Sequence, residues 1–298
     1  MSSSRRRLLA FGDSLTAGYH ASGRRFAPWA ELVCSLLNQE QEPAANIDAI
    51  DHVGMSGFTT RQLLSTADSE DVMDVVPLRW PGLRVKLREH SYSVVMIMCG
   101  TNDLADQYTT KEIVGNIAQL HAICHSFGAR TIAMTFPESH AVVKVASLRK
   151  VWSEANDAIR AWALSQPPSQ VSFVDAATLV PFDSANVKAG LWEMDGLHMS
   201  AAGYAAFGRG LAPLIKDFVS SSSAAASSST VRDGMTMLRE GARVRIDGLR
   251  SATQHNGRTG VVRHVPAEDG ARLGVELDGA PSGTRLLSVR RENLEEVV

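Results

Sequence analysis

The sequence predicts an α/β protein, with a parallel sheet covered by helices on both faces, followed by a small all-β domain. Short apolar runs alternate with helical patterns over about the first 219 residues, which is typical of βαβ units. One run, Ser93–Met98 (SVVMIM), is apolar from its second residue on, as expected for a strand buried on both faces. The last 68 residues instead alternate apolar and polar positions between turn signals.

The first part of the chain contains five candidate strands and four candidate helices. The apolar residues of Trp29–Leu37 recur on one face of a helix, and Pro137 stops the strand that begins at Arg130. The expected strands are Leu8–Phe11, Ile47–Val53, Ser93–Met98, Arg130–Thr135 and Val171–Val174, and the expected helices are Trp29–Leu37, Ile113–Phe127, Lys144–Leu164 and Ala201–Val219.

A run of serine and alanine, SSSSAAASSS at 220–229, divides the chain. It has no side chain that could build a core, so it predicts a flexible linker. The expected domains are 1–219 and 231–298, joined by a linker at 220–230. Four or five short strands in the second domain would form a small antiparallel barrel, with candidates at Ala242–Ile246, Gly260–Val265, Arg272–Leu277 and Arg285–Val289.

Composition excludes several classes of protein. The net charge of −2 gives no overall field for nucleic acid or an anionic membrane, and the segment 231–298 has no aromatic residue on which bases could stack. Three cysteines are too few for a disulfide framework, and no apolar run is long enough to span a bilayer. The apolar run after Arg7 is too short for a signal peptide. We therefore expect a cytoplasmic protein with no transmembrane segment and no nucleic-acid partner.

The first candidate catalytic residue is Ser14, in the GDSL sequence that follows the first expected strand. Ligands of parallel α/β sheets bind at the carboxyl ends of the strands, so a serine at this point can face a pocket. The alternative is that Ser14 only caps the following helix.

A serine nucleophile needs a base, and His198 is the candidate. It lies in DGLH at 195–198, between the last expected strand of the sheet and the last helix, and so at the same sheet edge. Asp195 is near enough in sequence to hold the tautomer of the imidazole. The alternative is that Asp195 caps the final helix and His198 is incidental.

Two further loops at this edge could stabilise an oxyanion. Asn102, in GTND at 100–103, follows Ser93–Met98, and Gly57 follows the strand Ile47–Val53. A glycine lets a backbone N–H approach a substrate closely, and an asparagine amide can supply a second donor. Each residue also has an ordinary alternative, as a turn glycine or a loop cap.

Taken together, the four loops resemble the SGNH, or GDSL-type, lipases and esterases. That family has four blocks that carry Ser, Gly, Asn and Asp-x-x-His. The resemblance covers residues 7–219 and implies a flavodoxin-like three-layer α/β/α sandwich of about five parallel strands. It implies Ser14 as the nucleophile, His198 as the base and Asp195 as the residue that orients His198.

The same resemblance implies an oxyanion hole made by the Ser14 and Gly57 backbone N–H groups and the Asn102 side chain. The second block departs from the family pattern, because it has His52-Val53 where an asparagine is common before the first glycine. The G-x-S-x-G elbow of the α/β-hydrolases is absent from the sequence.

The resemblance implies a serine esterase that works through an acyl-enzyme on a small-molecule carboxylic ester, with no metal and no organic cofactor. The sequence DGLHMSAAGY from position 195 is similar to that of members that act on small esters, which favours a short acyl group. Phe58 and Trp192 are candidate substrate-binding residues. Trp80, Phe182 and Leu191 are further candidates for pocket walls, and all five could equally be packing residues.

A different function remains open, in which the protein is an adaptor that works through 231–298. This segment resembles a small SH3-like barrel and could bind a protein partner. An adaptor would tolerate loss of the four blocks, and all four are intact, which favours the enzyme.

Two other groups could carry chemistry. His121 and His125 lie four residues apart on a helix, but no H-E-x-x-H motif accompanies them, so we expect an exposed helix face. Cys99 ends a buried strand, and we expect a packed, inert thiol.

Overall fold

The computed structural model of the chain describes residues 6–39, 46–228, 241–246, 253–264, 273–279, 286–289 and 293–296. The chain separates into two compact units, Met1–Ser227 and Ser228–Val298. We describe each unit by itself.

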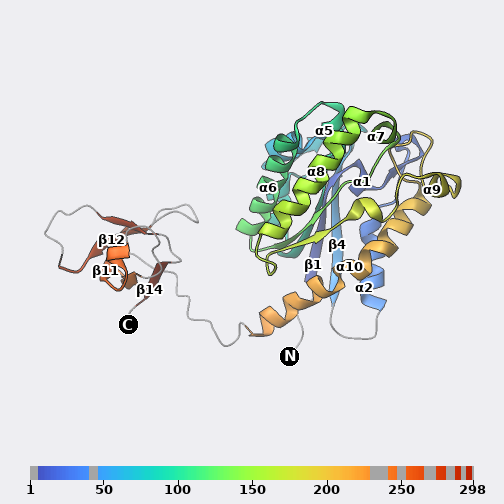
Figure 1. Ribbon diagram of the computed structural model, residues 1–298. Coiled ribbons are helices and arrows are strands. Elements are labelled where there is room, and N and C mark those ends of the chain that lie inside the picture. Colours follow the sequence, from blue (N-terminus) through green and yellow to red (C-terminus); the bar gives the residue numbers. More distant parts are fainter. Residues whose placement is uncertain are drawn as a thin grey trace. The chain divides into compact units, whose positions relative to one another are not determined.

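A five-stranded parallel sheet in the order β4-β1-β7-β8-β9 forms the middle layer of the first unit (Figure 1). Its strands are β1 (Arg6–Asp13), β4 (Ile47–Met55), β7 (Tyr92–Met98), β8 (Arg130–Met134) and β9 (Val171–Val174). All five expected strands are therefore present, and the prediction of a parallel α/β sheet is confirmed.

The two faces of this sheet are both buried, which explains the apolar runs in the sequence. Successive residues of a strand point to opposite faces. In β1, Leu8 and Ala10 belong to one core cluster and Leu9 and Phe11 to the other, and all four are fully buried. The strand β7 alternates between the same two clusters, so nearly every position must be apolar.

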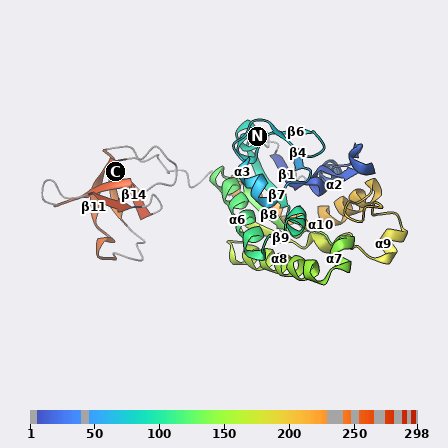
Figure 2. The ribbon, with the colours of Figure 1, turned by 90° about the horizontal axis from the view of Figure 1, so that it is seen from above.

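Helices cover each face of the sheet (Figures 1 and 2). The helices α2 (Trp29–Gln39) and α10 (Ala201–Ser228) pack on the face that holds Leu8. The opposite face is covered by α3 (Thr60–Ser65), α4 (Leu83–Glu89), α6 (Thr110–Ser126) and α8 (Ala146–Ser165). In the part of the chain that the structure describes, no helix has both the length and the apolar character needed to cross a membrane.

Shorter elements lie in the connections. They are α1 (Ser14–Ala17), β2 (Tyr19–His20), η1 (Ala21–Gly23), β3 (Arg25–Phe26), β5 (Val72–Met73), β6 (Arg79–Trp80), α5 (Thr101–Ala105), α7 (His140–Lys144), η2 (Ala176–Thr178) and α9 (Ser184–Lys188). Two of them, α1 and α5, carry Ser14 and Asn102. The strand pairs β2/β3 and β5/β6 are separate antiparallel ribbons.

The helix expected at Lys144–Leu164 is interrupted at its start. Val145 has extended backbone angles (φ −108°, ψ 108°), so α7 ends at Lys144 and α8 begins at Ala146. Ser139 caps α7, because its hydroxyl accepts a hydrogen bond from Val142 N. Apolar periodicity continues across Val145 and therefore does not reveal the break.

The helix expected to end at Val219 continues to Ser228, so the flexible linker predicted from Ser220 is helical over most of its length. Alanine is the best helix former, and no glycine or proline interrupts the sequence from Leu214 to Ser228. The expected boundary at residue 219 lies inside α10, whereas the compact units divide after Ser227.

The second unit contains a five-stranded antiparallel sheet in the order β13-β12-β11-β10-β14. Its strands are β10 (Arg243–Ile246), β11 (Thr259–His264), β12 (Leu273–Leu277), β13 (Leu287–Val289) and β14 (Leu294–Glu296), with one short 3₁₀ turn, η4 (Thr253–His255). Val265, Arg272 and Arg285, at the ends of expected strands, lie outside the described residues. Closure of the sheet into an SH3-like barrel stays a prediction.

Candidate active site

The carboxyl end of β1 delivers Ser14 to the edge of the sheet. The strand ends at Asp13, whose carboxylate accepts a hydrogen bond from Leu15 N at 3.0 Å and so caps α1. Gly12 is required just before this point, because a Cβ there would lie 1.9 Å from the Met98 carbonyl oxygen of β7. Ser14 is thereby fixed where two central strands meet, with 4% of its surface exposed.

Ser14, His198 and Asp195 form a continuous hydrogen-bonded chain. The Ser14 Oγ lies 2.9 Å from His198 Nε2, and His198 Nδ1 lies 2.8 Å from Asp195 Oδ2. When Nδ1–H donates to the carboxylate, Nε2 is left as the acceptor for the serine hydroxyl. The structure therefore brings together the three residues expected from the sequence, in the geometry that a nucleophile, a base and its orienting carboxylate require.

Asp195 is held ionised by its own loop. Burial alone would raise the pKa of Asp195, but hydrogen bonds from the backbone and ring of His198 and from Leu197 N outweigh burial and lower it. The backbone donors lie 3.0 Å and 2.9 Å from Asp195 Oδ1. Gly196, with φ of +65°, allows the tight turn that folds His198 back onto Asp195.

Tyr19 packs on the imidazole and was not expected from the sequence. Its ring centroid lies 4.2 Å from that of His198, with 32° between the planes. The Tyr19 carbonyl accepts a hydrogen bond from the hydroxyl of buried Tyr204 at 3.0 Å. The tyrosine follows the GDSL loop closely in sequence, but no local pattern shows that it turns back over the base.

The loops that carry Gly57 and Asn102 are tied to each other. Asn102 Nδ2 donates to the Phe58 carbonyl at 2.9 Å, which uses one of its two N–H groups. The next residue, buried Asp103, accepts a hydrogen bond from Thr60 N at 2.9 Å and another from the Thr60 hydroxyl. These bonds join the end of β4 to the start of α5, as an oxyanion site shared by the two loops would require.

The end of β4 also meets α1, the helix that begins at Ser14. A Cβ on Gly54 would lie 2.3 Å from Ala17 N, so the backbones of β4 and α1 approach each other closely. All four sequence blocks therefore lie at one edge of the sheet and are linked by direct contacts.

Another titratable group, the Asp13 carboxyl, lies directly beside Ser14. Burial raises the pKa of Asp13 to about 7, the hydrogen bond from Leu15 N lowers it in part, and the neighbouring Asp103 carboxylate raises it again. Asp13 is 1% exposed. Sequence reasoning treated this residue only as part of the GDSL block and missed its unusual ionisation.

A cavity of about 320 Å³ opens next to the triad. Its polar lining includes Asn102 and Asp195, and its apolar lining includes Leu104, Val142 and Leu148. A further cavity of about 460 Å³ shares Leu104 and Leu148 with it. The volume beside the triad is within the range of small-molecule sites.

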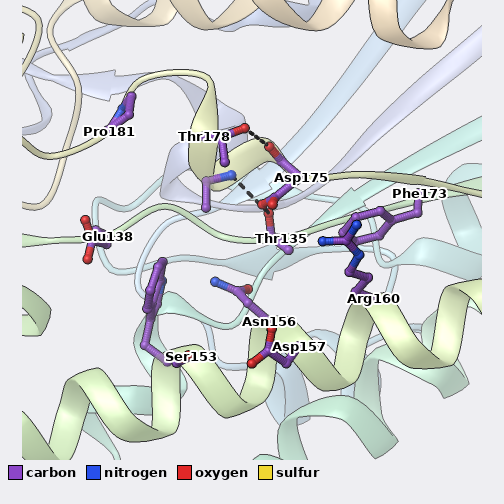
Figure 3. Close-up of a pocket in the computed structure, with 12 residues that line it drawn as sticks. Thr135, Glu138, Ser153, Asn156, Asp157, Arg160, Phe173, Asp175, Thr178 and Pro181 are labelled. Carbon is purple, nitrogen blue, oxygen red and sulfur yellow. Dashed lines mark hydrogen bonds between the residues drawn. The ribbon is translucent and has the colours of Figure 1, made fainter.

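A separate cavity of about 310 Å³ lies between α8 and the end of β9 (Figure 3). Asp175 accepts a hydrogen bond from the Thr135 hydroxyl at 2.8 Å on one side, and Arg160 lies near the Phe173 ring on the other (Figure 3). Neither Ser14, His198 nor Asp195 lines this cavity, whereas Asp195 does line the cavity that contains Asn102.

The aromatic residues expected to bind substrate are mostly packed. Trp192 is 6% exposed, belongs to a core cluster and donates from its indole N–H to the Pro181 carbonyl at 3.2 Å. Phe58 is 9% exposed and reaches the site through its carbonyl. Neither lines the cavity beside the triad, and their contact with substrate stays a prediction. Trp80, Phe182 and Leu191 are partly buried against the cores.

The expectation of an exposed face at His121 is wrong. His121 is fully buried against the Trp162 ring of α8, with the ring centroids 4.6 Å apart, and burial lowers its pKa to about 3. His125 is partly buried and its Nε2 lies 2.9 Å from the Thr131 hydroxyl. Among the described residues, no group of three or more His, Cys, Asp or Glu side chains is placed to hold a metal ion. Cys99 is buried in a core cluster.

Comparisons with known proteins bear on the family and the fold of the chain. The model of the GDSL-like Lipase/Acylhydrolase family matches residues 10–206, about two thirds of the chain. No curated protein matched the chain.

Solved structures share the fold at low sequence identity. A lipolytic protein of the G-D-S-L family from Desulfitobacterium hafniense is 18% identical with a TM-score of 0.52, over 70% of this chain and 99% of that one. A carbohydrate acetylesterase family member from Sinorhizobium meliloti is 19% identical with a TM-score of 0.52, over 72% of this chain and 99% of that one. A variant of an acetyl-xylooligosaccharide esterase from Geobacillus stearothermophilus is 20% identical with a TM-score of 0.51, over 72% of this chain and 94% of that one.

These likenesses confirm the flavodoxin-like α/β/α sandwich expected for the first unit. The family match includes the serine, glycine, asparagine and aspartate–histidine blocks at the carboxyl edge of that sandwich. The chain therefore belongs to the GDSL-like lipase/acylhydrolase family, and it is an enzyme that hydrolyses carboxylic esters.

Proposed function

We propose that the enzyme forms an acyl-enzyme on Ser14, with His198 as the general base and Asp195 as the residue that orients it. The observation that carries this proposal is the hydrogen-bonded chain from Asp195 through His198 to the Ser14 hydroxyl. A base 2.9 Å from a hydroxyl can accept its proton as the oxygen attacks.

The reaction has two half-reactions. Ser14 Oγ attacks the ester carbonyl carbon while its proton passes to His198 Nε2. The tetrahedral intermediate then releases the alcohol, which leaves with that proton. A water molecule next gives a proton to His198 and attacks the acyl-enzyme, and the acid leaves as Ser14 regains its proton. In both halves the ionised Asp195 stabilises the imidazolium. These steps need no metal and no organic cofactor.

We propose the Ser14 N–H, the Gly57 N–H and Asn102 Nδ2 as donors to the oxyanion. One N–H of Asn102 is occupied by Phe58 O, and the other is available for the substrate. A preorganised donor of this kind is worth about 10²–10³ in kcat. The bonds that tie the two loops together support this role, because they keep the donors from moving as charge develops.

The proposed substrate is an ester with a short acyl group. Two solved structures with this fold are described as a carbohydrate acetylesterase family member and an acetyl-xylooligosaccharide esterase. The cavity beside Asn102, of about 320 Å³, is at the lower end of the range for small-molecule sites, which supports a small acyl group.

A series of p-nitrophenyl esters from acetate to palmitate tests this proposal. We expect the highest kcat/KM for the shortest acyl groups, and no turnover above background for Ser14→Ala on any ester. Ser153→Ala, an exposed serine on α8, is the matched control and should keep wild-type kinetics. Hydrolysis by Ser14→Ala at a tenth of the wild-type rate would refute the assignment of the nucleophile.

We propose a separate role for 231–298 as an interaction module that binds a protein partner. Its own small core supports this, with Val244, Val262 and Val275 fully buried. On this proposal catalysis resides in 1–219, and the module can be removed without loss of ester hydrolysis. An adaptor without catalysis is the alternative, and the intact triad geometry favours the enzyme.

A further inference from the structure

The connection between α3 and α4 forms a small hairpin beside the Gly57 loop. Its strands β5 and β6 pair Val72 with Trp80 and Met73 with Arg79. Asp74 follows β5 at the start of the hairpin turn and is 5% exposed. A buried carboxylate at a turn is unusual and needs donors to compensate for its lost hydration.

Four N–H groups donate to the Asp74 carboxylate. Oδ1 accepts from Val76 N at 3.0 Å and Leu78 N at 2.9 Å, which shapes the hairpin turn. Oδ2 accepts from the Trp80 indole at 3.1 Å and from Ser56 N at 3.0 Å. Only the last of these bonds leaves the hairpin, and it ends on the residue directly before Gly57. Hydrogen bonds to an ionised acceptor are about twice as strong as neutral ones.

The hairpin also binds the backbone carbonyl of Ser56. Val75 N donates to the Ser56 carbonyl at 3.3 Å. In a planar trans peptide the C=O and the N–H point in opposite directions. Anchoring Ser56 O on the hairpin therefore directs the N–H of the same peptide, that of Gly57, away from the hairpin.

The side chain of Val75 limits which residue can occupy position 57. A Cβ on Gly57 would lie 2.7 Å from Val75 Cγ1, and Gly57 has φ of +78°, so only glycine fits beneath this valine. Val75 is 68% exposed, so burial in a core does not hold it there. Its position follows from the hairpin turn that Asp74 organises.

We infer that Asp74 is a positioning residue for catalysis, which acts through the hairpin to aim the Gly57 N–H at the oxyanion. The inference rests on the proposed function, in which that N–H is a donor. Asp74 lies 17 positions from Gly57 in sequence and touches no reacting atom.

Asp74→Asn tests the inference, because it preserves the shape of the side chain and removes the acceptor from one of its two oxygen positions. We expect kcat to fall by about 10- to 100-fold, the scale of a small misplacement in an active site, with KM within about twofold of wild type. The affinity for an aryl boronate, which forms a tetrahedral adduct on Ser14, should fall by the same factor as kcat/KM. A merely structural role would not make these two quantities fall together.

Asp71→Asn is the matched control on the same hairpin, since Asp71 is exposed and pairs only with Arg79 among the ion pairs of the described residues. It should leave kcat unchanged. If Asp74→Asn is unfolded by circular dichroism, Trp80→Phe replaces it, because it removes one donor to Oδ2 and should lower kcat two- to fivefold at constant KM.

Wild-type kcat in Asp74→Asn, or in Trp80→Phe when that variant replaces it, would overturn the inference, as would a fall in kcat with unchanged boronate affinity. Failure of the proposed function is distinguishable, because Ser14→Ala would then keep its activity. Loss of activity in Ser14→Ala together with full activity in Asp74→Asn would refute only the role of Asp74.

Discussion

Replacing Asp13 with asparagine should make the enzyme more resistant to unfolding at alkaline pH. The carboxyl is almost completely buried at the end of β1, and burial raises its pKa from 3.8 to about 7. Asparagine occupies the same volume and is as good a helix cap, so the bond to Leu15 N survives. What the substitution removes is the ionisation.

The sign of the effect follows from the direction of the shift. The pKa is higher in the folded protein than in the unfolded chain, so the folded state binds an extra proton between about pH 4 and pH 7. Stability therefore falls as the pH rises through this window, and the loss is complete above pH 7. Raising the pKa from 3.8 to about 7 corresponds to about 4 kcal/mol of stability, of which about 2 to 3 kcal/mol is lost between pH 5 and pH 8.

Urea unfolding of wild type and Asp13→Asn at pH 5 and pH 8 measures this pH-dependent part of the free energy of unfolding. Any constant cost of the amide cancels when the difference in unfolding free energy between the two proteins is compared across pH. Titrating groups that do not interact with Asp13 cancel as well. From pH 5 to pH 8, that difference in the free energy of unfolding should change by about 2 to 3 kcal/mol in favour of Asp13→Asn. Asp157→Asn, at an exposed carboxylate on α8, should show no such change. A difference that is the same at both pH values would refute the buried-carboxyl reasoning.

Four other outcomes are expected. Ser14→Ala should lower kcat by several orders of magnitude while circular dichroism is unchanged, and a burst of alcohol release in pre-steady-state kinetics should disappear with it. Asn102→Ala should lower kcat by about 10²–10³ with a smaller change in KM, and a change confined to KM would assign it to ground-state binding. Gly12→Ala should sharply lower the melting temperature, because its Cβ would lie 1.9 Å from the Met98 carbonyl, and a melting temperature equal to that of wild type would contradict the close approach of β1 and β7. A fragment ending at Ser228 should keep wild-type kcat/KM on a short ester, and a tenfold loss in a folded fragment would show that the second unit shapes the site.

The parts of the fold that follow from the sequence are those with a local signal. The apolar run ending at Met98 marks a strand because its residues are buried on both faces. The spacing of Asp195 and His198 is short enough for one turn to join them, and that turn forms. Each of these features is set by residues within a few positions of one another.

The features that escaped prediction depend on distant partners. Periodicity continues across Val145, although the backbone is extended there. His121 lies on the buried face of α6 with Ile117 and Cys124, but a polar side chain does not mark that face in the sequence, and the ring that covers it, Trp162, comes from α8. In the sequence, nothing distinguishes Asp74 from the other acidic residues of its loop. Its role depends on the hydrogen bond that the backbone N–H of Ser56, a residue 18 positions away, donates to its carboxylate. Local patterns do not encode such contacts.

Ser14 and His198 lie 184 positions apart in the sequence, and this separation affects when the site can form during synthesis of the chain. During synthesis Ser14 leaves the ribosome early, on a strand whose two hydrogen-bonded neighbours, β4 and β7, are still to be made. On the proposed mechanism, its hydroxyl is not activated until the loop before α10, which carries His198, has been made and has docked. Domains tend to fold from the amino end as they are synthesised, so ester hydrolysis is among the last properties that the nascent unit acquires. A chain interrupted between β9 and His198 contains all five strands of the sheet but lacks the proposed base, so on the proposed mechanism hydrolysis reports completed folding.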